Sequence, residues 1–218
     1  MTGQRTVKTR LRSAKGRPLA STLWLERQLN DPFVQRAKAQ GWRARSVFKL
    51  EEIDRRFGLI RKGATVLDLG AAPGSWTQYA AGRGARVVAV DLLPVEPVAA
   101  AVILQGDAQD PAVQDRLAAA LGGRADLVLS DIAANATGTR AIDRLRAEGV
   151  AESVLEIADR FLAPGGACLI KLVKGAEAKV RARALTLFRR VELIRPAATR
   201  KDSSETFLLA LERKPEAG

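Results

Sequence analysis

The sequence has no histidine and a single cysteine, Cys168, among its 218 residues. Without histidine there is no imidazole for acid–base chemistry, for a Ser-His or Cys-His nucleophilic pair, or for a histidine-ligated metal. One cysteine excludes an internal disulfide and a cysteine-rich zinc site, so no metal site is expected. Any proton transfer by a side chain must therefore use a lysine, a carboxylate, Tyr79 or Cys168.

Long apolar runs are also missing from the sequence. No stretch approaches the ~18 consecutive apolar residues of a membrane-spanning helix. The N-terminus is basic but lacks the apolar segment that a secretory signal peptide needs. We therefore expect a soluble, cytoplasmic protein without a membrane partner.

Acidic residues are scarce relative to basic ones: 24 Asp and Glu stand against 36 Lys and Arg, a formal net charge of +12. This charge predicts a polyanionic partner, most simply nucleic acid, although a generically basic protein would show the same excess. The basic residues cluster within 1–20, 36–62 and 181–201. The first cluster has six basic residues, no acidic one and little apolar content, which predicts a mobile basic arm over 1–20.

The remaining chain, residues 21–214, is expected to form one domain. Residues 21–62 show helical patterns and the second basic cluster, so they predict a helical extension that faces RNA. Residues 63–214 contain the strand patterns of a sheet core.

Two helices have clear end signals within the extension. Asp31 is an N-cap candidate in front of a proline, and Gly41 closes that helix. Ser46 is the expected cap of the second helix, which Gly58 ends. Lys49 lies at the edge of the apolar stripe of this second helix, so taken alone it is expected to be a solvated surface charge.

From residue 64 onward, short apolar runs alternate with helical patterns. Strands are predicted over 65–69, 87–90, 102–105, 127–130, 167–173, 191–195 and 206–211, and helices over 75–82, 111–121, 139–162 and 176–189. This alternation predicts an α/β fold with a doubly wound, mostly parallel, Rossmann-like sheet of seven strands. Only a loop separates the last two strands, which predicts a terminal antiparallel hairpin.

The turn from Gly70 to Gly74 lies between a predicted strand and a predicted helix. In that context a glycine turn lets the backbone approach a ligand. Pro73 removes one N–H donor that a phosphate-cradling loop would use, and the dinucleotide pattern G-x-G-x-x-G is absent. A turn of this kind is as common in plain connections, so the segment alone leaves both interpretations open.

Three side chains near this turn favour a binding site. Asp91 ends the second strand, where a carboxylate can take both hydroxyls of a ribose, and Asp107 follows the third, within reach of an adenine amino group. Trp76, which begins the next helix, can line the same pocket. Each of the three can equally be a cap or a core residue. Together they predict a nucleoside-containing cofactor, and their order fits S-adenosylmethionine better than NAD.

Lys171 lies inside an otherwise apolar strand, where a charge is costly unless it is paired, neutral or able to reach the sheet edge. Asp131 follows the neighbouring strand, so the two side chains are expected to meet at the crevice. A neutral Lys171 is therefore the best candidate for a base in a protein without histidine. Glu205 begins the last strand and, taken alone, is expected to be a surface charge.

Five segments together resemble the FtsJ/RrmJ family of ribosomal RNA large-subunit methyltransferases: Gly41–Leu50, Asp68–Gly74, Val90–Pro94, Gln105–Asp107 and Ser130–Asp131. The similarity keeps this order over residues 20–212. It implies S-adenosylmethionine-dependent methylation of the ribose 2′-oxygen of a uridine in the peptidyl-transferase region of large-subunit RNA. There are two departures: Ser75 stands where the family usually has a second glycine, and Ala134 stands where it usually has proline.

The resemblance places the family's Lys-Asp-Lys-Glu tetrad on Lys49, Asp131, Lys171 and Glu205. In this interpretation Lys171 is the base, Asp131 orients it and contacts the methyl donor, and Glu205 holds Lys49 or the substrate ribose. The candidate donor-binding residues are Gly74, Trp76, Asp91, Asp107 and Asp131.

Other functions stay open at this point. Methylation of a transfer RNA or mRNA-cap ribose is the nearest alternative, because no segment of the sequence reads bases and the target follows from the resemblance alone. A non-catalytic RNA-binding ribosome-assembly factor is a second alternative, and a nucleotide-dependent oxidoreductase is disfavoured by Pro73. No apolar stripe is left unexplained, which favours a monomer.

Overall fold

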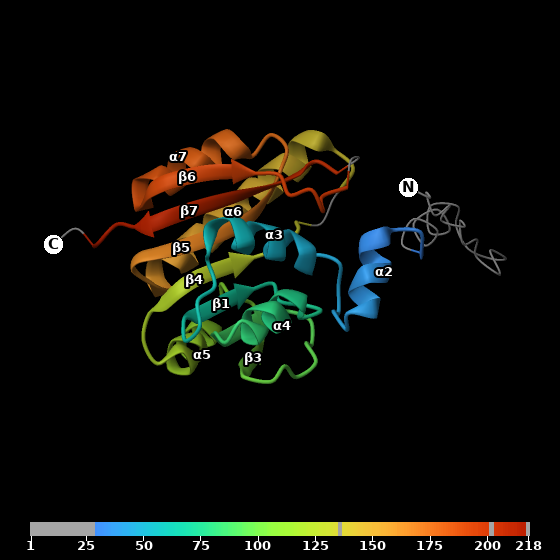
Figure 1. The fold of residues 1–218 in the computed structure, drawn as a ribbon. Coiled ribbons are helices and arrows are strands. Elements are labelled where there is room, and N and C mark those ends of the chain that lie inside the picture. Colours follow the sequence, from blue (N-terminus) through green and yellow to red (C-terminus); the bar gives the residue numbers. More distant parts are fainter. Residues whose placement is uncertain (1–28, 135–136, 201–202, 217–218) are drawn as a thin grey trace.

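The computed structural model describes residues 29–134, 137–200 and 203–216. The basic arm predicted over residues 1–20 lies outside these ranges. Figure 1 shows a central sheet with helices packed on both faces, and α2 to one side of it.

The sheet has seven strands: β1 (Thr65–Leu69), β2 (Arg86–Asp91), β3 (Ala101–Gln105), β4 (Ala125–Ser130), β5 (Leu162–Val173), β6 (Phe188–Ile194) and β7 (Glu205–Arg213). Their order across the sheet is β3-β2-β1-β4-β5-β7-β6. Strand β7 is antiparallel to both of its neighbours, and the other adjacent pairs are parallel. The predicted α/β class, the mostly parallel sheet and the terminal hairpin are confirmed.

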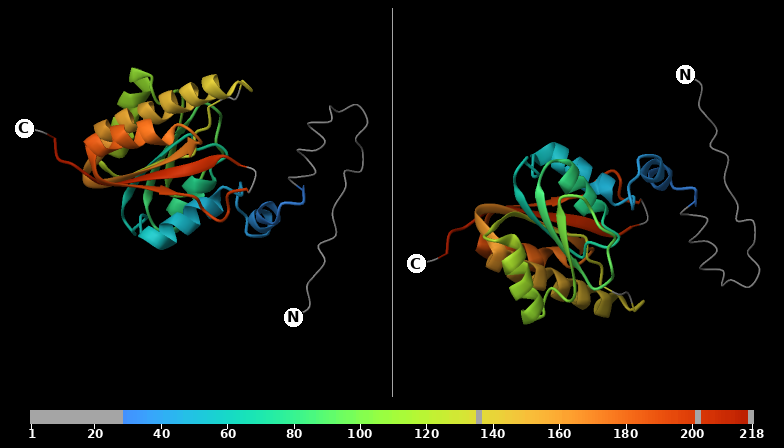
Figure 2. Two further views of the ribbon diagram at one scale, coloured as in Figure 1. Left: turned by 90° about the horizontal axis from the view of Figure 1, so that it is seen from above. Right: turned by 90° about the horizontal axis from the view of Figure 1, so that it is seen from below.

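The helices are α2 (Pro32–Ala39), α3 (Val47–Phe57), α4 (Ser75–Gly82), α5 (Pro111–Leu121), α6 (Arg140–Phe161) and α7 (Glu177–Leu187). Helices α5, α6 and α7 lie on one face of the sheet, and α3 and α4 lie on the other (Figure 2). Their apolar side chains pack against the strands in two separate core clusters. Because helices cover both faces, the central strands β1, β2 and β4 are almost uniformly apolar and buried. No helix in the described ranges is long and apolar enough to cross a membrane.

The ends of the two extension helices test the predicted signals. Asp31 caps α2, since its Oδ1 accepts a hydrogen bond from the backbone N–H of Phe33 at 2.9 Å. Gly58, with φ +63°, ends α3 as predicted. The prediction that Ser46 caps α3 is wrong. Its φ of −59° and ψ of −22° are helical, and its Oγ lies 3.0 Å from the Oγ of Ser75 instead.

Several element boundaries differ from the predicted ones, and two of the differences have a clear reason. Strand β5 begins five residues early, because Leu162 pairs with Ala125 ahead of a register shift. The Pro-Gly-Gly run 164–166 in that stretch indicated a loop rather than a strand. Helix α7 ends at Leu187 rather than at 189, because Phe188 enters the core as the first residue of β6.

Candidate active site

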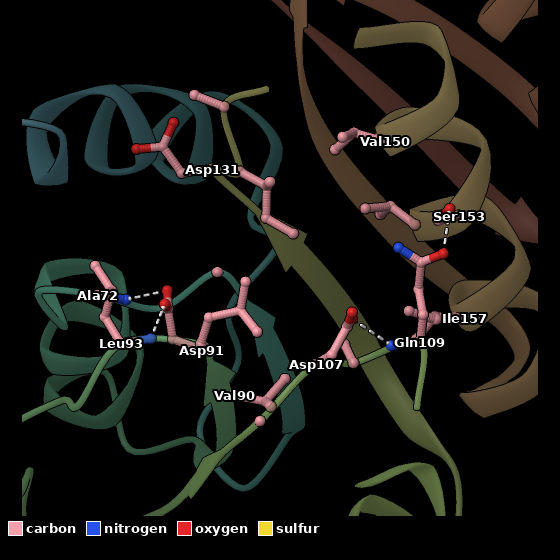
Figure 3. A pocket seen from close by; sticks show the side chains of 17 residues that line it. Ala72, Val90, Asp91, Leu93, Asp107, Gln109, Asp131, Val150, Ser153 and Ile157 are labelled. Carbon is pink, nitrogen blue, oxygen red and sulfur yellow. Dashed lines mark hydrogen bonds between the residues drawn. The ribbon is translucent and has the colours of Figure 1, made fainter. Parts of the chain in front are cut away.

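The strand order reverses between β1 and β4. A cavity of about 610 Å³ opens next to this point, at the carboxyl ends of the neighbouring strands. Gly70 and Ala72 of the glycine turn, residues that follow β2, β3 and β4, and one side of α6 line it (Figure 3). Gly70 has φ +72°, and a Cβ there would overlap the side chain of Ile132. A glycine is therefore required where the loop after β4 packs against the turn.

Asp91 connects two walls of this cavity. Its Oδ2 accepts a hydrogen bond from the N–H of Ala72 at 2.8 Å, and its Oδ1 accepts one from the N–H of Leu93 at 2.8 Å (Figure 3). Each carboxylate oxygen has two lone pairs, so both oxygens can still accept a hydrogen bond from a hydroxyl group. The carboxylate is thus held in place and keeps acceptor capacity at the cavity.

Asp107 lines the same cavity farther along the sheet edge. Its Oδ1 accepts a hydrogen bond from the N–H of Gln109 at 2.9 Å, which fixes the turn after β3. The Gln109 side chain contacts Ser153 Oγ of α6 at 3.1 Å, and both residues line the cavity. Sequence analysis missed this α6 wall, because helical periodicity does not tell which side of a helix closes a pocket.

Two predicted donor-binding residues lie outside the cavity lining. Trp76 is only 2% exposed, packs against Phe207 and donates its Nε1–H to the carbonyl oxygen of Ser46 at 2.9 Å. It therefore belongs to the core between α3, α4 and the sheet. Gly74 caps α4 with φ +104° and packs against Arg43. Gly74 is the last residue of the glycine turn and Trp76 lies two positions further on, and they contact Arg43 and Ser46 respectively.

The structure brings Lys171 and Asp131 together. Ser130 and Ile170 are paired in neighbouring parallel strands, so the two residues that follow them are adjacent. The Lys171 Nζ lies 3.0 Å from Oδ1 of Asp131 and donates a hydrogen bond to the carbonyl oxygen of Asp131 at 2.5 Å. The Lys171 side chain is 9% exposed. Lys171 thus ends in a buried ion pair rather than at an exposed sheet edge.

Lys49 and Glu205 form a second ion pair on the same side of the sheet. The Lys49 Nζ lies 2.6 Å from Oε2 of Glu205. The expectation that each residue, taken alone, is a solvated charge is wrong, because α3 packs over β7 and buries the lysine. Burial raises the pKa of Glu205, but Lys49 and the charge of Lys171 outweigh it and hold the pKa below its usual value.

The antiparallel register shows that the two ion pairs are close to each other. Lys171 pairs with Phe207, and Val173 pairs with Glu205. Paired residues, and residues two apart on one strand, share a face of the sheet. Lys171, Phe207 and Glu205 therefore share a face, and the Nζ of Lys49 lies 5.6 Å from the centroid of the Phe207 ring.

Asp68 is an ionisable group at the site that the sequence analysis did not single out. It is 1% exposed in β1 and accepts a hydrogen bond from Thr77 Oγ1 at 2.6 Å. Burial raises its pKa to about 7; the hydrogen bond from Thr77 opposes this rise, and the charges of Asp131 and Asp91 add to it. The feature of the sequence that could have identified Asp68 is an acidic residue inside an otherwise apolar strand.

Three arginines of the predicted basic clusters make internal contacts. Arg45 pairs with the buried Asp31 and with the carbonyl oxygen of Ala198, and Arg200 Nε lies 3.0 Å from Asp31 Oδ2. Arg43 donates to backbone carbonyls near the glycine turn. Other basic side chains of the extension do face solvent. These are Arg36, Lys38, Arg55, Arg56, Arg61 and Lys62.

Comparisons with known proteins agree with this geometry. Residues 42–213 match the family model described as FtsJ-like methyltransferase. A Gluconobacter oxydans protein named ribosomal RNA large subunit methyltransferase E is 51% identical, over 94% of this chain and 78% of its own length. A protein of the same name from Acidiphilium cryptum is 49% identical, over 98% of this chain and 96% of its own.

A solved structure supports the fold independently. The crystal structure of a ribosomal RNA methyltransferase from Plasmodium falciparum superimposes with a TM-score of 0.71. The match covers 79% of this chain and 98% of that one, at 22% sequence identity.

Proposed function

This chain belongs to the FtsJ-like methyltransferase family, and on that basis we propose that it transfers a methyl group from S-adenosylmethionine to a ribose 2′-oxygen of large-subunit ribosomal RNA. The printed names of the Gluconobacter and Acidiphilium relatives support the RNA class. The resemblance of the sequence motifs supports the 2′-oxygen, and a uridine, as the acceptor.

The cavity suits the methyl donor in size and in chemistry. Its volume of about 610 Å³ lies within the range of small-molecule sites. Asp91 would hold the ribose hydroxyls of the donor, Asp107 its adenine amino group, and Asp131 the end nearest the reaction. When bound, S-adenosylmethionine supplies an electrophilic methyl group on a positively charged sulfur.

The two buried ion pairs would form the acceptor side. A ribose hydroxyl becomes a good nucleophile only as its proton leaves, and a positioned base contributes roughly 10²–10⁴-fold to such a step. We assign that role to the Nζ of Lys171, which takes the hydroxyl proton in its neutral form. Asp131, within 3.0 Å, orients this amine and receives an ion-pair contact once the amine is protonated.

Lys49 and Glu205 are assigned to positioning. The Glu205 carboxylate, which shares a face of the sheet with Lys171, holds the Nζ of Lys49 at 2.6 Å.

The observation that carries the proposal is the 3.0 Å contact between Lys171 and Asp131, beside a nucleoside-sized cavity that Asp131 also lines. Withdrawing two lysines from solvent is costly unless they are paired, as they are here with two partly buried carboxylates, and a pure RNA-binding surface gains nothing from it. This favours the enzyme over a non-catalytic assembly factor.

The direct test is to incubate the protein with methyl-labelled S-adenosylmethionine and three substrates: free large-subunit RNA, the assembled large subunit, and transfer RNA. Nuclease digestion and mass analysis then locate the methylated ribose. We expect one 2′-O-methylated uridine in large-subunit RNA or its particle. Transfer confined to transfer RNA, or methylation of a base, would contradict the proposal.

A further inference from the structure

Arg43 lies in the segment between α2 and α3, and its guanidinium has three backbone partners. Its Nη1 donates to the carbonyl oxygens of Pro73 at 3.2 Å and Glu96 at 2.7 Å, and its Nη2 donates to that of Pro97 at 2.8 Å. A guanidinium presents five N–H donors in a rigid fork, so one side chain can connect two loops. Arg43 connects the glycine turn to the loop that follows β2.

Asp91 connects the same two loops at the cavity. It accepts hydrogen bonds from Ala72 of the turn and from Leu93 of the loop. A carboxylate thus accepts N–H groups from both loops, and a guanidinium donates to carbonyl oxygens of both. Hydrogen bonds therefore hold the loop after β2 against the turn at two points: through Asp91 ahead of Leu93, and through Arg43 at Glu96 and Pro97 beyond it.

The packing around Arg43 also explains why residue 74 is a glycine. A Cβ on Gly74 would lie 2.5 Å from Arg43 Nη1 and 3.0 Å from Val95 Cγ1. The backbone N–H of Arg43 donates to Gln78 Oε1 of α4 at 3.1 Å. Arg43 is therefore fixed on the turn and on the helix that follows it, and the missing side chain of Gly74 leaves room for the arginine.

The loop depends on such contacts because its own side chains are poorly packed. Leu92 and Leu93 line the cavity, yet they are 67% and 64% exposed. A loop that must become ordered on binding reduces affinity, and a loop that is already ordered avoids this cost.

We propose that Arg43 is a positioning residue for the donor cavity: it holds the loop after β2 against the glycine turn, so that Asp91 and Leu93 are in place before the donor binds. This inference rests on the proposed function, because it takes S-adenosylmethionine as the ligand of that cavity. Arg43 acts through the loop and does not itself line the cavity.

The test compares Arg43→Ala and Arg43→Lys with Arg55→Ala, which removes the same charge from an exposed position on α3. Calorimetry measures the Kd for S-adenosylmethionine, and hydrogen exchange of the ligand-free proteins measures the opening of residues 92–97. We expect Arg43→Ala to raise the donor Kd about tenfold or more, an effect typical of lost preorganisation. Arg43→Lys should behave similarly, because a single ammonium nitrogen cannot reach both loops.

Kinetics separate positioning from a general loss of structure. The donor KM should rise in both Arg43 variants. Their kcat at saturating donor should equal that of the wild type, and their RNA affinity should equal that of Arg55→Ala. Faster exchange confined to residues 92–97 is the accompanying signature. The inference is overturned if Arg43→Ala binds the donor like wild type, or if Arg55→Ala weakens donor binding equally. Failure of the wild type to bind the donor would instead overturn the proposed function.

Discussion

The donor side and the acceptor side of the site are built in different ways. On the donor side, the carboxylates Asp91 and Asp107 are fixed by backbone N–H groups of nearby turns within residues 72–109, and the loop after β4 and helix α6 complete the cavity. The acceptor side joins Lys49 to Glu205 across 156 positions and Asp131 to Lys171 across 40. The polar contacts of the donor carboxylates are therefore local, whereas those of the acceptor side exist only in the assembled fold. Substitutions should therefore separate donor binding from chemistry.

The largest expected effect is that of Lys171→Ala on the acceptor side. Loss of the base should lower methyl transfer by roughly 10²–10⁴-fold, with the donor Kd changed only a few-fold because the donor contacts remain. Single-turnover rates and calorimetry measure the two quantities. Lys179→Ala, on exposed α7, is the matched control and should leave both unchanged. Loss of donor binding in Lys171→Ala would show that the two sides are not separable.

Asp91→Asn is expected to do the opposite of Lys171→Ala, because it should weaken binding of the donor. The amide keeps the shape of the side chain but turns an NH₂ group toward the N–H of Ala72 or Leu93, which leaves a donor facing a donor. Losing such a hydrogen bond costs about 1–3 kcal/mol, so the donor Kd should rise about tenfold or more while RNA binding is kept. Asp115→Asn, exposed on α5, is the control. An unchanged donor Kd would remove Asp91 from the donor side.

The Lys49–Glu205 pair should give an intermediate effect that depends on pH. A lowered pKa means that the folded state favours the carboxylate. The stabilisation is therefore fully present above pH ~4.5 and is lost as the pH falls through the lowered folded-state value. Glu205→Gln should reduce stability at pH 7, and the difference from wild type in urea unfolding should shrink at acidic pH.

A double-mutant cycle with Lys49→Met tests whether the pair acts as a unit. A coupling of about 0.5–3 kcal/mol in kcat/KM is expected for residues in direct contact. Additive effects of the two substitutions would show that Lys49 and Glu205 act separately.

The smallest effect at mildly acidic pH is expected for Asp68→Asn, because the wild-type carboxyl, with a pKa of about 7, is then mostly neutral. The folded state binds the proton more tightly than the unfolded chain, so wild-type stability falls as the pH rises toward and through this value. Between pH 6 and 9 the loss is on the order of 1 kcal/mol, and the variant should not show it. Urea unfolding at both pH values is the measurement. Parallel pH profiles for wild type and variant would contradict it.

The same division explains which site residues could be predicted from the sequence. Asp91 and Asp107 follow strands at the spacing of a nucleoside site, and both line the cavity. Gly74 ends the glycine turn and Trp76 begins the next helix, and neither lines the cavity: they contact Arg43 and Ser46. Linear spacing gives a position along a strand or helix, and it does not give the neighbour across the sheet.

By itself, the sequence determined the order of strands and helices, the switch in the sheet where a crevice must lie, and the chemical types available in a chain without histidine. Those properties follow from short-range periodicity and backbone chirality, which act within about twenty residues. Only the tertiary structure decided that Lys49 pairs with Glu205, that Asp68 is buried, and that Arg43 fastens two loops. Burial and pairing depend on segments distant in the chain, so the free energy of a charge is set only when those segments pack together.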